Sequence, residues 1–352
     1  MKIKLISFVI LLFVLVVVNG VKAQPPDRTI DSAIRNQVIE QLLKDLNKSY
    51  VFLETAKAME KDIRQRQQNK EYDEITSARS FAKKLTEDLQ KISKDKHLRV
   101  LYSHQALPVR KDNAEPTAGE IAEENLYYRR VNFGFEKVER LQGNIGYIDL
   151  RNFWDPKLGE ETVAAAMNFV ANTDALIFDL RQNGGGDPAM VALIISYLFG
   201  DKPIHVNNIY FRERNKTEEF WTSPKVLGKK YGNKDVYVLT SGYTFSGGEE
   251  FSYDLKNLKR ATIIGETTAG GANPGGRVRL HDHFSVFLPV GHAVSPITKT
   301  NWEGVGVSPD IAVPKEQALK TAHLLALNKL LEKATDEREK NSLKDLIDRL
   351  QK

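Results

Sequence analysis

The strongest constraint on the fold is an alternation of short apolar runs and helical segments between residues 144 and 265. Short apolar runs are typical of buried strands, and here each is followed by a turn or a segment of helical character. The strand-like runs are residues 144–150, 175–180, 236–239 and 262–265, and the helical ones are 162–171, 188–199 and 247–258. Strands that alternate with helices favour parallel pairing, so the predicted fold class is α/β.

The composition agrees with a folded chain. Of its 352 residues, 41% are hydrophobic and 28% are charged, enough to bury a core as one or two domains. The chain has no cysteine, which excludes disulfides, zinc–thiolate sites and thiol catalysis. Any nucleophile for acyl transfer must therefore be serine, threonine or lysine.

The first 23 residues have the layout of a signal peptide. Lys2 and Lys4 precede a 14-residue apolar run that only Ser7 interrupts, and small residues follow. We expect cleavage between Ala23 and Gln24, which makes the mature chain periplasmic or secreted. The alternative is an uncleaved membrane anchor, although a spanning helix needs about 20 apolar residues.

The rest of the chain predicts four regions. They are an N-terminal helical module at 24–102, a linker region at 103–143, the core at 144–314 and C-terminal helices at 315–352. Removing residues 1–23 lowers the formal net charge from +5 to +2, and no basic block with interleaved aromatics remains. Nucleic-acid binding therefore has little support.

Two glycine-rich turns lie between a buried strand and a helix. The first contains Gly184, Gly185 and Gly186, whose amides can face an anion or a developing oxyanion, although a tight structural turn is an equally good interpretation. The second contains Ser246, followed by Gly247. A serine there has the geometry of a nucleophile on a sharp strand-to-helix turn. A helix cap is the plainer interpretation, because Ser246 and Glu249 match the S-x-x-E capping box.

A serine nucleophile needs a base and a group that orients the base. Seven histidines are available. His97 follows a helical segment in the tripeptide Asp95-Lys96-His97, and His281 and His283 alternate in a strand-like stretch. For any single histidine, an ordinary structural role is the plainer interpretation.

Six short motifs occur in order across residues 95–314, and together they resemble the serine peptidases of the tricorn and C-terminal-processing (tail-specific) family. Within this family, the sequence most resembles the short branch, which is similar to the repeats of interphotoreceptor retinoid-binding protein. The motifs are Asp95-Lys96-His97-Leu98 (D-x-H-[ST]), residues 146–150 (GYI-x-[LI]), residues 179–186 (DLR-x-N-x-GG), the Ser246 turn, residues 265–271 (GE-x-T-x-G) and residues 303–310 (EG-x-GV-x-PD). The resemblance implies a ClpP/crotonase-like core.

The resemblance also implies the roles of individual residues. In the tricorn branch, Ser246 would be the nucleophile, His97 the general base and Glu303 the acid that orients it. The oxyanion hole would combine the Gly247 amide with one from Gly184, Gly185 or Gly186, of which we expect Gly185. No cofactor or metal is implied, and peptides or unfolded protein segments are the expected substrates. Whether the chain forms a homo-oligomer stays open.

Three features of the family are missing. The processing branch uses a Ser–Lys dyad, but Gly271 occupies the lysine position, and Lys256 and Lys259 lie about 15 to 20 Å along the helix from Ser246. Lys96 replaces the serine that tricorn has beside its histidine. Residues 98–143 are also too few for the PDZ domain that many processing peptidases carry there.

The sequence leaves two alternatives to a serine peptidase. A non-catalytic protein that binds an apolar ligand, like the retinoid-binding relatives, would use the same fold, but it would not need His97, Ser246 and Glu303 together. A metallohydrolase would use His281 and His283, which period-two spacing places on one strand face, but no third ligand is evident nearby.

Overall fold

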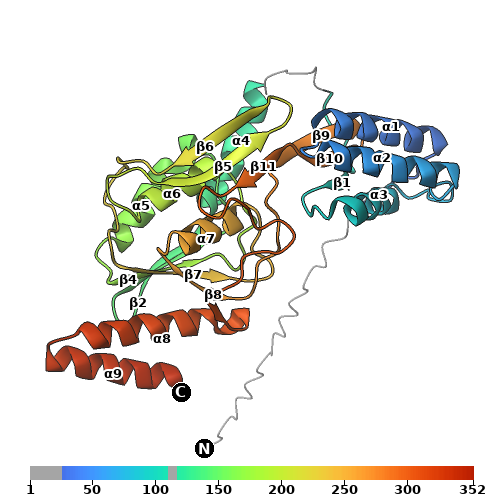
Figure 1. Ribbon diagram of the computed structural model, residues 1–352. Coiled ribbons are helices and arrows are strands. Elements are labelled where there is room, and N and C mark those ends of the chain that lie inside the picture. Colours follow the sequence, from blue (N-terminus) through green and yellow to red (C-terminus); the bar gives the residue numbers. More distant parts are fainter. Residues whose placement is uncertain (1–25, 110–116) are drawn as a thin grey trace, which may run out of the picture.

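The computed structural model describes residues 26–109 and 117–352 (Figure 1). The expected signal peptide at residues 1–23 lies outside the described residues. Within them, none of the helices combines the length and the apolar character that a membrane crossing requires.

A six-stranded sheet forms the core of the molecule. Its spatial order is β12 (Ile311–Ala312), β8 (Thr262–Gly265), β7 (Asp235–Thr240), β4 (Ala175–Asp179), β3 (Ile145–Leu150) and β2 (Phe135–Leu141). The first five strands pair in parallel, and β2 is antiparallel to β3. The α/β prediction, with strands at 144–150, 175–180, 236–239 and 262–265, is confirmed.

Helices cover both faces of this sheet because its strands alternate apolar side chains between them. In β4, Leu176 and Phe178 belong to a hydrophobic cluster with the helices on one face. These helices are α5 (Pro156–Val170), α6 (Pro188–Ser196) and α7 (Gly247–Asn257). Ala175 and Ile177 belong to the opposite cluster, with α8 (Lys315–Lys333) and α9 (Glu337–Gln351). Figure 1 shows these last two helices as a pair beneath the core.

The N-terminal helices are α1 (Ser32–Ser49), α2 (Leu53–Gln68) and α3 (Ala78–Ser93). They pack on a three-stranded antiparallel sheet of β1 (Arg99–Tyr102), β10 (Phe284–Pro289) and β9 (Gly275–His281). The predicted N-terminal helical module is present, and it also contains a three-stranded sheet that the periodicity did not predict. Two of its strands come from residues 275–289, which local sequence patterns do not connect with the N-terminal region.

Residues 103–143 contain more structure than a linker. They include α4 (Ala118–Arg130), the short 3₁₀ turn η1 (Asn132–Gly134) and the edge strand β2. The sequence predicted a linker here because neither element has a clear apolar pattern: α4 buries none of its residues, and buried and exposed residues alternate only weakly in β2. A further sheet of β11 (Gly291–Val294), β5 (His205–Phe211) and β6 (Lys216–Trp221) completes the fold.

The topology determines where the two glycine-rich turns meet. The first turn follows β4 and the second follows β7, and these strands are parallel neighbours. The carboxyl ends of adjacent parallel strands lie at the same edge of a sheet, which is the usual position of a site in such folds. The chain therefore brings both turns together.

Candidate active site

Ser246 sits on a strained turn at the start of α7. Its φ of 53° and ψ of −120° are unusual for a residue other than glycine. The Ser246 N–H donates to Glu249 Oε2 at 2.9 Å, which is one half of the predicted capping box. The Glu249 N–H also donates to the carbonyl oxygen of Ser246. The Ser246 side chain lines a cavity.

Glu249 connects the serine turn to residues 265–271. It is fully buried and also accepts hydrogen bonds from the Thr268 hydroxyl at 2.5 Å and from the amides of Gly270 and Gly271 at 2.6 and 2.8 Å. Burial outweighs these donors and raises the pKa of its carboxyl group. The sequence indicated only a capping partner here, so this connection was missed.

Asn183 joins the first glycine turn to the serine turn. The buried Asn183 side chain donates to the Leu150 carbonyl at 2.9 Å and accepts from the Gly185 amide at 2.8 Å, while its backbone carbonyl accepts from Phe245 N–H. Gly185 lies so close that an added Cβ would be 2.6 Å from the Ser246 Cβ. Asn183 belongs to a recognised motif, but its side chain's role required the structure.

Two backbone amides behind the serine have no protein partner. Within residues 26–109 and 117–352, neither Gly186 N–H nor Gly247 N–H makes a hydrogen bond. The two glycines are in contact, because a Cβ on Gly247 would lie 3.0 Å from the Gly186 nitrogen. The amides of Gly184 and Gly185 are already used, by the Arg151 carbonyl and by Asn183.

His97 reaches this cavity from the loop between α3 and β1. Its ring centroid lies 4.3 Å from that of Phe245 and 5.7 Å from that of Phe287. Its backbone N–H donates to Asp95 Oδ1 at 2.9 Å, and its Nδ1 lies 3.9 Å from the same oxygen. Burial, assisted by the charge of Arg99, lowers the pKa of His97 to about 4, so the imidazole is neutral at physiological pH.

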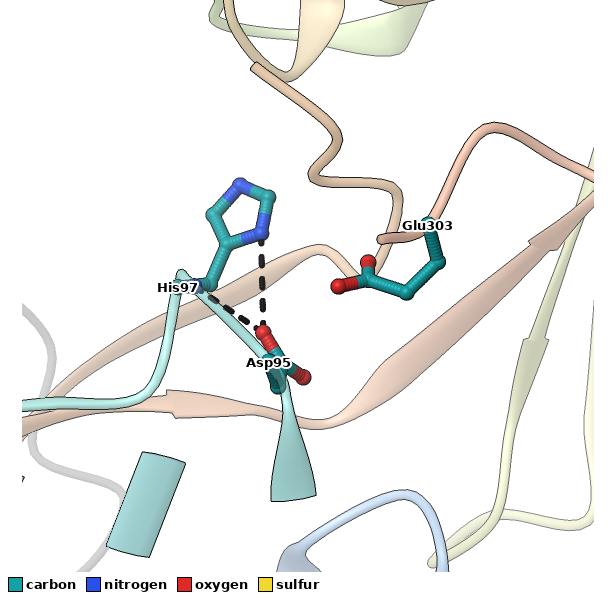
Figure 2. A group of neighbouring side chains, drawn as sticks. All are labelled: Asp95, His97 and Glu303. Atoms are coloured by element: carbon teal, nitrogen blue, oxygen red, sulfur yellow. Dashed lines mark hydrogen bonds and ion pairs between the residues drawn. The ribbon is translucent and has the colours of Figure 1, made fainter. Parts of the chain in front are cut away.

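Glu303 approaches His97 from the far end of the chain. Its Oε2 accepts from the Ala272 amide at 2.6 Å, whereas its Oε1 and the His97 Nδ1 are buried without a partner among the described residues. One ligand-type atom from each of Asp95, His97 and Glu303 lies within 4.8 Å of the other two. Figure 2 shows the Glu303 carboxylate pointing toward the pair of Asp95 and His97. Burial and the charge of Asp95 raise the pKa of Glu303 to about 7.

Asp95 is the second carboxylate in this group. It is buried, and its oxygens accept from the His97 amide, from Asn273 Nδ2 at 3.0 Å and from the Tyr50 hydroxyl at 3.2 Å. These donors fix its orientation, while its Oδ1 lies 3.9 Å from His97 Nδ1, which is too far for a hydrogen bond. The sequence predicts no role for Asp95 beyond its place in a motif, and no sequence pattern indicates that Tyr50 or Asn273 supports the site.

Ser246 and His97 line a cavity of about 540 Å³. Its walls come from both modules and include His97, Ser246 and the glycines at 184 and 186. The remaining lining residues are Arg99, Leu101, Phe245, Pro274, Gly275, Arg277 and Phe287.

The lysine positions of a Ser–Lys dyad are not compatible with this site. A Cβ on Gly271 would lie 2.3 Å from the Phe245 ring and 2.7 Å from His97 Cε1, so the imidazole and the aromatic ring fill the space that a side chain needs. Lys256 donates to the Ser308 carbonyl at 2.6 Å and pairs with Asp310. Lys96 donates to the Ala269 carbonyl at 2.5 Å.

His281 and His283 are not paired ligands on one strand face. His281 ends β9, and His283 lies in the turn before β10. The His283 ring interacts with Arg28 at 2.6 Å and with the Ser103 carbonyl at 3.0 Å. Among the described residues, the group of Asp95, His97 and Glu303 is the one cluster of three that has metal-ligand spacing. The period-two interpretation is therefore wrong, because the hairpin turns between the two histidines.

Comparison with known families supports the family predicted from the six sequence motifs. Residues 144–313 match the description "Peptidase family S41", and residues 31–137 match its N-terminal domain as described for eukaryotic IRBP. The chain belongs to peptidase family S41. The two matched regions correspond to the α/β core and to the N-terminal module with the segment up to β2.

Two curated proteases resemble about half of this chain. It is 27% identical over 180 residues to the carboxy-terminal-processing protease of Bartonella bacilliformis, a match that covers 49% of this chain and 40% of that protein. It is 30% identical over 209 residues to a protein of Sulfurisphaera tokodaii provisionally named a tricorn-like protease C-terminal subunit, covering 56% of this chain and 22% of that one. The chain thus spans less than half the length of these curated relatives.

Solved structures support the fold of this S41 member. A protein from Parabacteroides merdae ATCC 43184, provisionally named a peptidase, superposes with a TM-score of 0.58 at 18% identity. The match covers 83% of this chain and 96% of that one. The predicted architecture, a ClpP/crotonase-like α/β core with an N-terminal helical module and a C-terminal helical tail, is confirmed.

Proposed function

We propose that this S41 member is a serine peptidase that hydrolyses peptide bonds with Ser246, His97 and Glu303. One observation carries the proposal: Ser246 and His97, from distant parts of the chain, line one cavity, and Glu303 lies beside His97. Two amides next to the serine have no partner among the described residues. Convergence of a nucleophile, a base and an orienting acid is the arrangement that acyl transfer requires.

In the proposed mechanism, His97 accepts the hydroxyl proton of Ser246 while Oγ attacks the peptide carbonyl. Glu303 Oε1, which lacks another partner, stabilises the imidazolium that forms. His97 then gives its proton to the leaving amine as the carbon–nitrogen bond breaks. Water attacks the acyl-enzyme with His97 again as base, and Ser246 leaves with the proton. The neutral state of the buried imidazole suits it to the first step.

The oxyanion hole in this proposal consists of the amides of Gly247 and Gly186. Of the three glycines that the sequence left open, Gly186 is favoured because the Gly184 amide donates to the Arg151 carbonyl and the Gly185 amide to the Asn183 side chain. Loss of one such donor typically costs about 3 kcal/mol of transition-state stabilisation. Gly185 would instead support the turn from behind.

Labelling with a fluorophosphonate tests the proposed function directly. We expect the chain from Gln24 to be labelled at Ser246, and the label to be lost in both Ser246→Ala and His97→Ala, each checked for folding by circular dichroism. Ser246→Ala should also abolish cleavage of a quenched fluorescent peptide. Peptidase activity in folded Ser246→Ala, or no labelling of a folded wild-type chain, would refute the assignment. The second result would favour the apolar-ligand alternative.

The expected substrates are peptides or unfolded segments, which a cavity of about 540 Å³ at the junction of two modules could admit. We also propose that the protein is exported, because residues 1–23 have the signal-peptide layout. Intact-mass measurement of the protein from its exporting host would show a mature chain that starts at Gln24. A mass that includes Met1 would contradict cleavage.

A further inference from the structure

The wall of the cavity that contains Ser246 includes two arginines in register. Arg99 in β1 is paired directly with Phe287 in β10, and Phe287 is paired with Arg277 in β9. Directly opposed residues in neighbouring strands project to the same face. Arg99, Phe287 and Arg277 therefore form one row across this sheet, and all three line the cavity that contains Ser246 and His97.

The two guanidinium groups are not neutralised within the protein. Among the described residues, Arg277 has no hydrogen bond or ion pair, and its side chain is exposed. Arg99 donates through Nε to the Lys96 carbonyl at 2.7 Å and lies over the Phe245 ring, but it has no carboxylate partner. By contrast, Arg279, two residues further along β9, is paired with Asp282.

No acidic side chain of the described residues lines the cavity. A second hollow of about 450 Å³ adjoins it, because Leu101 and Arg277 belong to the walls of both. Its other lining residues are also without acids: Tyr102, Ser103, His104, Gln105, Leu107 and Ser285. A bound peptide thus meets positive charge beside the serine and along the neighbouring hollow. Like charges placed close together without counterions favour an anionic ligand.

We propose that Arg99 and Arg277 select peptides that carry a carboxylate close to the scissile bond, a specificity that rests on the proposed peptidase function. Arginine binds a carboxylate through two parallel N–H donors, and Phe287 between the two arginines offers an apolar surface to the stem of the same side chain. The carboxylate can belong to an aspartate or glutamate side chain or to the C-terminus of a short peptide. Both sources present the same planar anion.

Matched peptide pairs test this specificity. Quenched fluorescent peptides that differ only by Asp/Asn or Glu/Gln, with the acid placed on either side of the scissile bond, report the side-chain preference as a ratio of kcat/KM values. A parallel pair with a free or amidated C-terminus reports a terminal carboxylate. We expect a preference of about tenfold or more for one acidic pair, as one charge-assisted contact allows. The preference should fall at high salt because these arginines are exposed.

Variants assign the preference to the arginine row. Arg277→Gln and Arg99→Gln should each reduce the ratio toward one, and Arg277→Lys should keep part of it because the charge remains. Arg279→Gln is the matched control: it removes the same charge from the same strand outside the cavity and should leave the ratio unchanged. Equal cleavage of the acidic and neutral peptides by wild-type protein whose Ser246 labels would overturn this inference alone. Absence of both labelling and cleavage would overturn the proposed function as well.

Discussion

The side chains of His97 and Glu303 are both largely buried, and burial shifts their pKa values in opposite directions. Burial disfavours the charged form of each group, so the pKa falls for the imidazole and rises for the carboxyl group. The pKa of Glu303 is about 7, and that of His97 is about 4. Between these values the histidine is already neutral while the glutamate is still largely protonated. The ionisation of Glu303 therefore sets the lower pH limit of the proposed activity.

The corresponding prediction concerns the pH profile of kcat/KM. Activity should fall as the pH drops through about 7, because a protonated Glu303 cannot stabilise the imidazolium. Glu303→Gln should lower kcat/KM by about a hundredfold or more and remove this step from the profile. The exposed Glu136→Gln is the control and should keep the wild-type profile. A Glu303→Gln variant that retains the step near pH 7 would contradict the assignment.

At the scale of elements, helix α7 combines the nucleophile with a pair of buried acids. Its first turn follows Ser246, and one turn apart on the same helix lie Glu250 and Asp254, which are almost completely buried. Glu250 Oε1 and both carboxylate oxygens of Asp254 have no hydrogen-bond partner among the described residues. Burial raises the pKa of both groups, that of Glu250 to about 7, and the charge of Glu250 raises that of Asp254 further.

This pair predicts a pH-dependent stability. Carboxyl groups with a raised pKa in the folded state favour folding when protonated, so the contribution of Glu250 is complete below about pH 4 and is lost as the pH rises through 7. The pKa of Asp254 is raised too, so its contribution is lost in the same direction, as the pH rises. Asp254→Asn should therefore raise the melting temperature at pH 8, by about 2–4 °C for each kcal/mol gained, and change it little at pH 5. The exposed Asp348→Asn provides the comparison. Equal effects of Asp254→Asn at both pH values would exclude this explanation.

For the whole molecule, the decisive feature is that the site is divided between two modules. His97 belongs to the N-terminal module, and Ser246 and Glu303 belong to the rest of the chain. Arg212, just after β5, connects the two: its guanidinium donates to the Tyr50, Asn47 and Lys48 carbonyls at the end of α1, at 2.8, 2.9 and 2.6 Å. Cations at a helix C-terminus are favourable, and here one also fixes the position of the module.

Arg212→Gln should therefore loosen the junction. We expect faster amide hydrogen exchange around residues 47–52 and about tenfold slower fluorophosphonate labelling of Ser246, with the global fold retained. Arg214→Gln removes a nearby exposed arginine that pairs with Glu218 instead, and it should alter neither quantity. Unchanged exchange in Arg212→Gln would show that other contacts hold the module.

Local sequence patterns determined the elements that are strongly patterned. The strands β3, β4, β7 and β8 are apolar because both faces are covered, and the three N-terminal helices have clear periodicity, so each was predictable. The segments α4 and β2 were missed because an exposed helix and an edge strand bury little and leave no such pattern. The ordered motifs further allowed His97, Ser246 and Glu303 to be named.

Tertiary structure alone decided how these residues meet. The pairing of β1 with β10, across more than 180 residues of chain, places Arg99 beside Phe287 and Arg277. Other long-range hydrogen bonds bring Glu249, Asn183 and Asp95 into the support of the site, although their local sequence indicates caps and turns. Propensity and periodicity act between residues near in sequence, whereas strand pairing and the satisfaction of buried polar groups act between residues near in space. The sequence by itself therefore determined the elements and the candidate chemistry, and the packing decided the geometry of the site.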